Sequence, residues 1–248
     1  MIRFESVSKS LSGREVLKNF SLNIEKGSAH TILGPTGSGK TVTLRHIVKL
    51  LEPDDGCIKF DGVDISSFNG KDLELYRTKF GYLFQSGALI AWMNVADNVA
   101  LPLREKTKMG EVEISRRVSE VLELVGMGGT EGKMPDELSG GMRKRAGLAR
   151  AIVIQPEVIL FDEPTSGLDP IMSRKIDDVI RDLKSVLGVT VVMVTHDLIS
   201  AFSLSDRISM IFEGQIVFDG TVPEFESSEN GLIRDFIAAQ VPKVTKQY

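Results

Sequence analysis

Eight consecutive residues in the N-terminal part of the chain have the types and spacing of a phosphate-binding loop. The segment fits the pattern G-x-x-x-x-G-K-[ST] at every position. Its glycines would let the backbone adopt positive φ and approach a ligand, so that N–H groups point at phosphate oxygens. Lys40 would supply a cation to the β- and γ-phosphates, and the Thr41 hydroxyl could ligate Mg²⁺. The pattern predicts a nucleotide site formed by Gly34, Pro35, Thr36, Gly37, Ser38, Gly39, Lys40 and Thr41.

Two acidic residues directly follow a continuous apolar segment, 158–161, later in the chain. In phosphate-loop enzymes an acid at this place holds Mg²⁺, and a neighbouring carboxylate can polarise the attacking water. We therefore assign Asp162 to the metal and Glu163 to the water. Acids often end strands, so the pair acquires this meaning only together with the phosphate loop.

A third motif, Leu138-Ser139-Gly140-Gly141, has the form of a helix start with Ser139 as its N-cap. Such a terminus exposes N–H donors and is a ready anion site. It falls in a helical segment separate from the phosphate loop. The phosphate that it contacts would therefore belong to a nucleotide on a second molecule.

In their order along the chain, these motifs resemble those of the ATPase subunits of ABC transporters. The resemblance covers almost the entire chain, and the matching segments are 34–41, Gln85, 138–141, 160–164, 166–169 and His196. It implies that Gln85 senses Mg²⁺ or the attacking water and that His196 touches the γ-phosphate. It also implies that Ser139 and Gly141 contact the nucleotide of the opposite subunit. Asp169 would link the two sites of the dimer.

The same resemblance implies an ATPase that uses ATP and Mg²⁺ as a homodimer and drives an integral-membrane permease. The protein would lie on the cytoplasmic face of the inner membrane. Segments 83–89 and 93–103, together with Met142 and the basic run Arg143-Lys144-Arg145, further resemble the ATPases of Mla/Mce-type lipid transporters. That narrower resemblance implies phospholipid or sterol transport and a lipid-binding substrate protein as a further partner.

Two positions depart from the usual family pattern. Met142 follows Leu-Ser-Gly-Gly where the family usually has Gln. Leu11 stands where an aromatic ring usually stacks on adenine, so we expect an apolar rather than a stacked contact with the base. Trp92 lies shortly after Gln85, and the sequence leaves two interpretations open: core of the helical segment, or an anchor for the permease.

Three alternative functions remain open at this point. The first is the ATPase of an importer for a small polar solute. The second is a soluble ABC protein that acts on nucleic acid or ribosomes, although such proteins usually have two ATPase halves or long coiled-coil inserts. The third is a regulatory nucleotide-binding module without turnover, which the presence of Glu163 and His196 disfavours.

Composition narrows the class of protein. The chain has 248 residues, of which 42% are hydrophobic and 26% charged, and a formal net charge of −4. This charge argues against a nucleic-acid partner, which would need a basic face. Apolar runs are too short for a transmembrane helix, and the N-terminus has no signal-peptide profile, so we expect a soluble cytoplasmic protein. The lone Cys57 alternates with strand-like neighbours and is predicted to be a buried structural thiol.

The apolar pattern predicts the elements that position these motifs. Alternating residues predict an antiparallel strand pair within 2–24 and a hairpin of 207–212 with 215–219. Continuous apolar runs predict buried strands at 29–33, 80–84, 158–161 and 190–194. A helix should start at Asp169-Pro170 and bury Ile176, Val179, Ile180, Leu183 and Val186.

We therefore predict an α/β phosphate-loop NTPase fold with an N-terminal antiparallel β subdomain and an inserted helical subdomain. A single domain would span 1–248. Segments 1–85 and 157–230 would form the catalytic core, and 86–156 the helical subdomain. Segment 231–248 would be a C-terminal tail, packed on its own subunit or on a partner.

Overall fold

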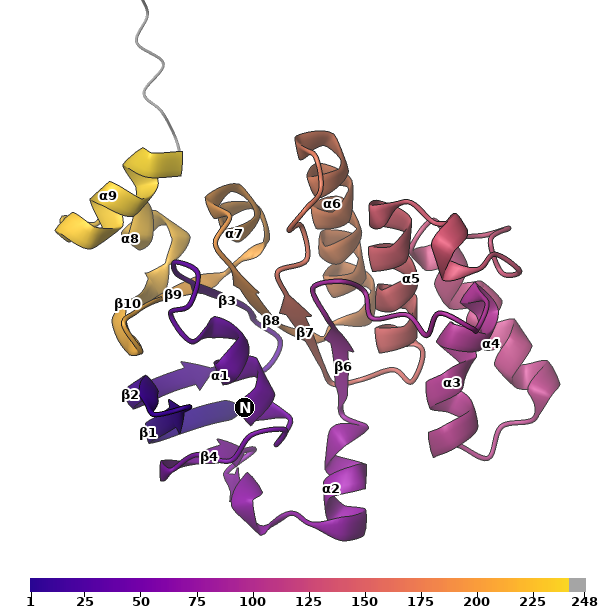
Figure 1. Ribbon diagram of the computed structural model, residues 1–248, viewed down its shortest axis with the longest axis horizontal. Coiled ribbons are helices and arrows are strands. Elements are labelled where there is room, and N and C mark those ends of the chain that lie inside the picture. The colour runs from indigo at the N-terminus through magenta and orange to yellow at the C-terminus, as the bar shows by residue number, and fades with distance from the viewer. Residues whose placement is uncertain (241–248) are drawn as a thin grey trace, which may run out of the picture.

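A six-stranded sheet forms the centre of the computed structural model, which describes residues 1–240 (Figure 1). Its strand order is β10-β9-β3-β8-β7-β6. The five strands from β9 to β6 are parallel, and β10 pairs with β9 as an antiparallel hairpin. The strands are β3 (Ala29–Leu33), β6 (Phe80–Leu83), β7 (Val158–Asp162), β8 (Thr190–Thr195), β9 (Arg207–Phe212) and β10 (Gln215–Thr221).

A second, antiparallel sheet has the order β2-β1-β4-β5 and is formed by the N-terminal quarter of the chain. Its first two strands are the pair that the alternation of apolar residues predicted. The strands are β1 (Ile2–Leu11), β2 (Arg14–Ile24), β4 (Asp55–Phe60) and β5 (Val63–Asp64).

The helices are distributed around both sheets, and every regular element between β6 and β7 is helical. Those are α3 (Val95–Lys106), α4 (Glu111–Leu124), the short 3₁₀ turn η2 (Pro135–Glu137) and α5 (Gly140–Ile152). They form the right-hand side of Figure 1. The others are α1 (Lys40–Ile47), the 3₁₀ turn η1 (Ile65–Ser67), α2 (Gly70–Arg77), α6 (Pro170–Leu187), α7 (Leu198–Leu204), α8 (Val222–Glu226) and α9 (Gly231–Gln240).

Both faces of the central sheet are covered, which explains why its strands are continuously apolar. Successive side chains of a strand point to opposite faces. In β7, Val158 and Leu160 join a core shared with α1 and the antiparallel sheet. Ile159 and Phe161 join the core formed with α3, α4, α5 and α6. A third cluster packs α7, α8 and α9 over β3 and β9. These observations confirm the predicted α/β architecture.

Three local predictions need correction or completion. Val186 is 66% exposed, because the buried face of α6 ends at Leu183, one turn earlier. Cys57 is only half-buried, and its thiol donates to the Glu5 carboxylate across β1 and β4 (3.3 Å). In α9, Ile233 is buried in the third cluster while Leu232 is 41% exposed, so this part of the tail packs on its own subunit. The rest of the tail, 241–248, lies outside the described residues.

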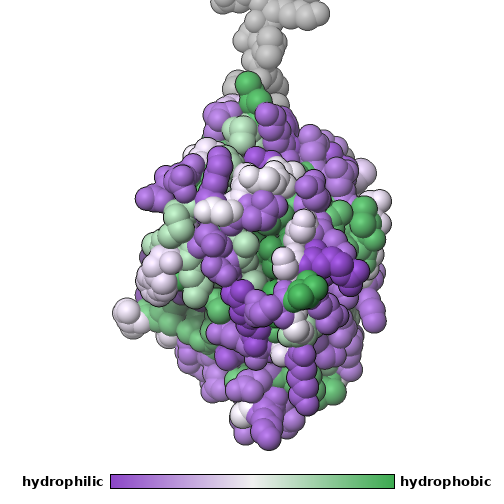
Figure 2. All heavy atoms as spheres, turned by 90° about the vertical axis from the view of Figure 1, so that its right-hand side faces the viewer, coloured by the Kyte–Doolittle hydropathy of each residue, from purple (hydrophilic) through white to green (hydrophobic). Residues whose placement is uncertain are grey.

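The outer surface is dominated by hydrophilic residues on the side of α3 and α4, with hydrophobic residues in scattered spots (Figure 2). Within residues 1–240, none of the helices has the length and apolar character that a membrane span requires.

Candidate functional site

The predicted phosphate loop joins the buried strand β3 to helix α1, as the pattern requires. Gly39 caps α1 with φ 109°, in the left-handed region that favours glycine. A Cβ at Gly34 would collide with the carbonyl oxygen of Ile211 in β9, so a side chain has no room there. The Ser38 hydroxyl is buried within the loop and has no hydrogen-bond partner among residues 1–240. A buried polar atom in this state fits a loop built to receive polar ligand atoms.

Lys40 begins α1 and folds its side chain back over the loop. Its Nζ donates to the carbonyls of Gly34 (2.8 Å) and Pro35 (3.0 Å) and lies 3.4 Å from Glu163 Oε1. Burial lowers the pKa of Lys40, and the Glu163 carboxylate opposes that shift. The ammonium group is therefore held at the place where the loop's N–H groups would face phosphate.

Thr41 and Asp162 come from opposite sides of the site and meet directly. Thr41 Oγ1 donates to Asp162 Oδ1 (2.8 Å), and the Tyr82 hydroxyl donates to Asp162 Oδ2 (3.3 Å). Burial raises the pKa of Asp162. A hydroxyl and a carboxylate are the hard oxygen donors that Mg²⁺ takes from protein, with the remaining positions filled by phosphate oxygens and water. This donor pair fits Mg²⁺.

Glu163 occupies a turn with φ 51°, and its backbone N–H donates to Val194 of β8. This turn places the carboxylate between two other predicted residues. Glu163 Oε2 lies 2.8 Å from His196 Nδ1 and accepts from the Thr195 hydroxyl (3.4 Å), while Oε1 faces Lys40. The ends of β7 and β8 thus bring an acid, an imidazole and an ammonium group together at one edge of the sheet.

These groups line a cavity of about 380 Å³ above the phosphate loop. Gln85 reaches this cavity from the loop after β6, and its Nε2 donates to the Ser166 hydroxyl (3.1 Å). Leu11, at the end of β1, lines it at the place assigned to the base. The lining residues are Leu11, Val16, Thr36, Gly37, Gly39, Lys40, Thr41, Val42, Gln85, Glu163, Ser166 and His196.

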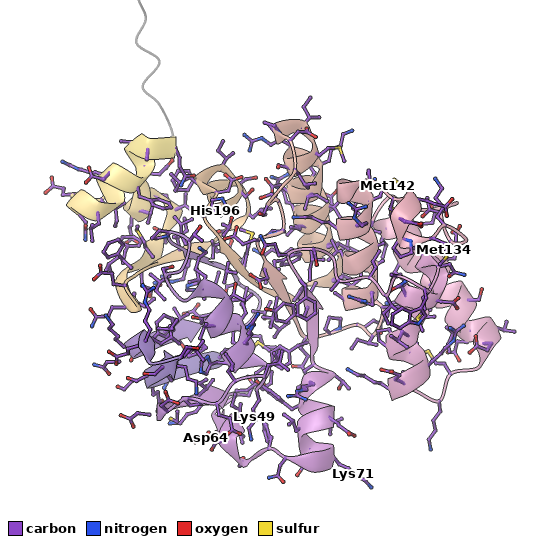
Figure 3. The ribbon with its side chains drawn as sticks, in the orientation of Figure 1. Lys49, Asp64, Lys71, Met134, Met142 and His196 are labelled. Atoms are coloured by element: carbon purple, nitrogen blue, oxygen red, sulfur yellow. The ribbon has the colours of Figure 1, made fainter. Side chains whose placement is uncertain are left out.

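The remaining predicted residues lie elsewhere. Ser139 caps α5, where its hydroxyl accepts from the Met142 N–H (3.3 Å), but neither Ser139 nor Gly140 nor Gly141 lines the cavity. Figure 3 shows Met142, on α5, well separated from His196. Asp169 caps α6 and accepts from two N–H groups of its first turn.

Sequence reasoning missed Lys144, on the inner side of α5. Its buried Nζ donates to the carbonyls of Glu163 (3.2 Å) and Ser166 (2.7 Å), so it holds the loop that carries the acid. Burial lowers the pKa of Lys144 to about 8. In the sequence, the run Arg143-Lys144-Arg145 is typical of an exposed basic face. The one feature that could have indicated a contact between Lys144 and the site is the position of this run directly after the Leu-Ser-Gly-Gly motif.

The fold and this site together define a phosphate-loop ATPase with an inserted helical segment. The family model described as "ABC transporter" matches residues 17–166, more than half of the chain. The chain belongs to the ABC-transporter ATP-binding family, and it is an ATP-hydrolysing subunit of an ABC transporter.

Particular relatives resemble it along nearly its whole length. It is 43% identical over 236 residues to "Probable ribonucleotide transport ATP-binding protein mkl" of Mycobacterium leprae, which covers 95% of this chain and 68% of the relative. It is 40% identical over 237 residues to "Intermembrane phospholipid transport system ATP-binding protein MlaF" of Escherichia coli, which covers 96% of this chain and 88% of that protein.

Solved structures agree with this assignment. A dimeric post-hydrolysis state of the cassette MJ0796, bound to ADP and Pi, has a TM-score of 0.82 at 32% identity. The match covers 90% of this chain and 99% of that one. CbiO1 of Clostridium perfringens, part of the ABC transporter complex cbiONQ, has a TM-score of 0.83 at 29% identity and covers 98% of this chain and 96% of its own.

Proposed function

We propose that this ATPase powers the movement of a phospholipid or related lipid by a partner integral-membrane permease. The observation that carries this proposal is the 40% identity to MlaF over 96% of the chain, a protein named for intermembrane phospholipid transport. The resemblance of segments 83–89 and 93–103 to lipid-transporter ATPases supports it. Such a subunit would work at the cytoplasmic face of the inner membrane, and a lipid-binding protein would be a further partner.

The site residues take the following roles in this proposal. The loop N–H groups and Lys40 bind the β- and γ-phosphates, and the helix dipole of α1 favours their charge. Thr41, Asp162 and Gln85 would hold Mg²⁺, which would supply positive charge against the developing negative charge of the phosphates. Glu163 orients the attacking water and accepts its proton. His196 holds the Glu163 carboxylate through Nδ1 and keeps its other ring nitrogen for the γ-phosphate.

A complete site requires two copies of the chain. The phosphate-loop cavity contains no atom of the motif at 138–141, and that motif nevertheless presents a helix N-terminus suited to phosphate. In a head-to-tail homodimer, Ser139, Gly140 and Gly141 of one subunit would close over the nucleotide of the other. Asp169, at the start of α6, would link the two sites. The dimeric MJ0796 structure supports this arrangement.

An exposed groove beside α2 is suited to a permease helix. A cavity of about 600 Å³ lies between α2 and the end of α3, lined by charged residues around Leu75, which is 67% exposed.

Trp92, in the loop between β6 and α3, is 80% exposed, so it is no part of the helical core. Trp is one of the residue types that most often anchor protein interfaces, so this exposed side chain is a candidate contact for the permease. We assign Trp92 to the permease interface. It belongs to the helical subdomain 86–156, which is inserted into the core formed by 1–85 and 157–230.

A polar cargo is the alternative, and one observation favours it. The mycobacterial relative, at 43% identity, is named for ribonucleotide transport, although this chain spans only about two thirds of that protein's length. The names of these two relatives therefore point to different classes of cargo.

The deciding experiment uses the complex purified in detergent from its native membrane. Mass spectrometry identifies bound lipids, and ATPase rates are measured with phospholipid, ribonucleotides, amino acids or sugars added. We expect bound phospholipid or sterol and turnover that rises with lipid. Turnover that responds to a polar solute and is indifferent to lipid would assign the subunit to an importer. A complex without ATP turnover would identify a regulatory module.

A further inference from the structure

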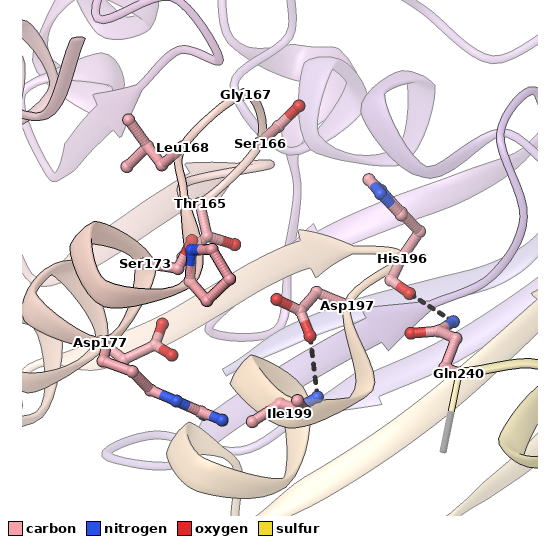
Figure 4. Close-up of a pocket in the computed structure, with 12 residues that line it drawn as sticks. Thr165, Ser166, Gly167, Leu168, Ser173, Asp177, His196, Asp197, Ile199 and Gln240 are labelled. Atoms are coloured by element: carbon pink, nitrogen blue, oxygen red, sulfur yellow. Dashed lines mark hydrogen bonds between the residues drawn. The ribbon is translucent and has the colours of Figure 1, made fainter. Parts of the chain in front are cut away.

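Gln240, the last residue of α9, reaches the loop that carries His196. Helix α9 packs through the buried Ile233, and through Phe236 and Ile237, on a cluster that includes Leu198 of α7. This packing brings the end of α9 beside a cavity of about 330 Å³ formed by the segments 165–168, 173–177 and 196–199 (Figure 4). Residues 44 positions apart in the chain thereby meet.

The Gln240 side chain makes two hydrogen bonds to the backbone of that loop. Its Nε2 donates to the His196 carbonyl (2.8 Å), and its Oε1 accepts from the Leu198 N–H (3.1 Å). Leu198 is the first residue of α7, so its N–H has no partner within the helix. Asp197 caps the next two N–H groups, from Ile199 and Ser200. One amide group thus fixes the backbone on both sides of Asp197.

The His196 side chain depends on this backbone for its position. Half of that side chain is exposed, and the polar contact it makes within residues 1–240 is the one to Glu163. The backbone at 196 lies between the end of β8 and the start of α7. A displacement there moves the imidazole relative to both the acid and the phosphate site. Misplacement by about 1 Å can cost an enzyme on the order of 100-fold in rate.

We propose that Gln240 is a positioning residue for His196 and that docking of α9 is thereby coupled to ATP hydrolysis. Gln240 touches neither nucleotide nor reacting atoms. It acts through the His196 backbone, and the proposal therefore rests on the role that the proposed function gives to His196.

The first test compares two substitutions with a control on the same helix. Gln240→Ala removes both hydrogen bonds. Gln240→Glu keeps the size and the acceptor for Leu198 but cannot donate to the His196 carbonyl. We expect both to lower kcat about tenfold, with unchanged Kd for ATP and unchanged thermal unfolding. Asp235→Ala, an exposed change on α9, should leave kcat at the parental value. Parental kcat in Gln240→Ala would overturn the proposal.

A double-mutant cycle separates this proposal from the role of His196 itself. His196→Ala should lower kcat, and adding Gln240→Ala should then change kcat no further. An equal loss from Gln240→Ala in both backgrounds would show that Gln240 acts elsewhere. Parental kcat in His196→Ala alone would refute the role of His196, and with it this proposal.

An independent readout does not need turnover. The chain has three histidines, and the His196 imidazole signals in NMR spectra are assigned by their absence in His196→Ala. We expect these signals to shift in Gln240→Ala and to stay in place in Asp235→Ala. Unchanged His196 signals in Gln240→Ala would overturn the proposal even if kcat fell.

Discussion

Lys40 shows how a single side chain prepares the phosphate loop for its ligand. The Lys40 side chain is 6% exposed, and the present partners of its ammonium group are two loop carbonyls and one carboxylate. A cation that is buried and paired only with oxygen acceptors is well suited to exchange one of them for a phosphate oxygen. The local charge is also balanced, because Glu163 faces the same ammonium group.

Replacing Lys40 with Ala should abolish ATP binding in isothermal calorimetry while the far-UV circular dichroism of the chain stays unchanged. The reason is that the substitution removes the cation at the phosphates and leaves the apolar core intact. Lys26→Ala, an exposed lysine before β3, is the matched control and should bind ATP normally. Parental ATP affinity in Lys40→Ala would show that the phosphate-loop assignment is wrong.

At the scale of elements, the site depends on where strands end. β7 delivers Asp162 and Glu163, β8 delivers His196, and β3 leads into the phosphate loop, all at one edge of the central sheet. Helix α5 adds Lys144, which ties the segment 163–166 to the helical insert. The loop between β6 and α3 then joins Gln85 in the site to Trp92 on the outside. Movement of the insert can therefore reach the nucleotide through two connections.

Substitution of Trp92 by Ala tests the outer end of this connection. Loss of such an anchor commonly costs at least about 2 kcal/mol, or roughly 30-fold in affinity. We expect the isolated subunit to retain its ATP affinity and its own turnover, while binding to the permease weakens and lipid no longer stimulates the complex. Pull-down of the permease and ATPase rates measure this. Val112→Ala, equally exposed but on α4, should have no effect. If the Trp92→Ala variant binds the permease and responds to lipid like the parent, the permease interface lies elsewhere on the surface.

At the scale of the whole molecule, the proposed shared site would need two copies of the chain, because the motif at 138–141 does not line the phosphate-loop cavity of its own subunit. Bound ATP would then hold the two subunits together, and its hydrolysis would allow the dimer to dissociate. A variant that binds ATP without hydrolysing it should consequently remain a dimer.

Glu163→Gln is expected to be that variant. It keeps the shape of the side chain but cannot accept the proton of water, and we expect at least about 100-fold slower hydrolysis. Light scattering with Mg-ATP should show a dimer, whereas the nucleotide-free variant and Glu157→Gln, an exposed control before β7, should be monomers. Monomers at every concentration, together with normal turnover, would contradict both the role of Glu163 and the shared site.

The pH dependence of stability should reveal the buried Asp177 on α6. This side chain is 1% exposed, its Oδ1 has no hydrogen-bond partner in the described part of the chain, and burial raises its pKa to about 6 from the usual 3.8. Between those two values the folded state binds a proton that the unfolded state has released. The contribution of Asp177 to the free energy of unfolding therefore falls as the pH rises from about 4 to about 6, by about 3 kcal/mol in total.

Asp177→Asn removes this ionisation. We expect the variant to unfold at higher urea than the parent at pH 7, and the difference to disappear near pH 4. Asp182→Asn, an exposed residue on the same helix, should show no such trend. A stability difference that is the same at pH 4 and pH 7 would mean that folding leaves the pKa of Asp177 at its unfolded value.

The sequence alone predicted the fold class, most of the strands and helices, the phosphate loop and the two acids after segment 158–161. These features follow from patterns that are local in the chain: apolar alternation, continuous buried runs, helix caps and a phosphate loop whose geometry needs glycine at fixed positions. The strand ends carry Asp162, Glu163 and His196 to one edge because parallel strands end together. Local pattern was therefore sufficient to predict the phosphate loop and the two acids, whereas Gln85 and His196 were assigned only through the resemblance to the family.

Only the tertiary structure decided which side chains reach across between distant elements. Lys144 contacts the Glu163 loop, Gln240 contacts the His196 loop, and Trp92 faces solvent, while Val186 lies beyond the buried face of α6. The sequence around these residues does not distinguish a side chain that contacts a distant element from one that is exposed to solvent. The outcome depends on where helices α5, α6 and α9 cross the elements beneath them. These crossing positions are determined by packing between segments far apart in the chain, so they cannot be predicted from short-range periodicity.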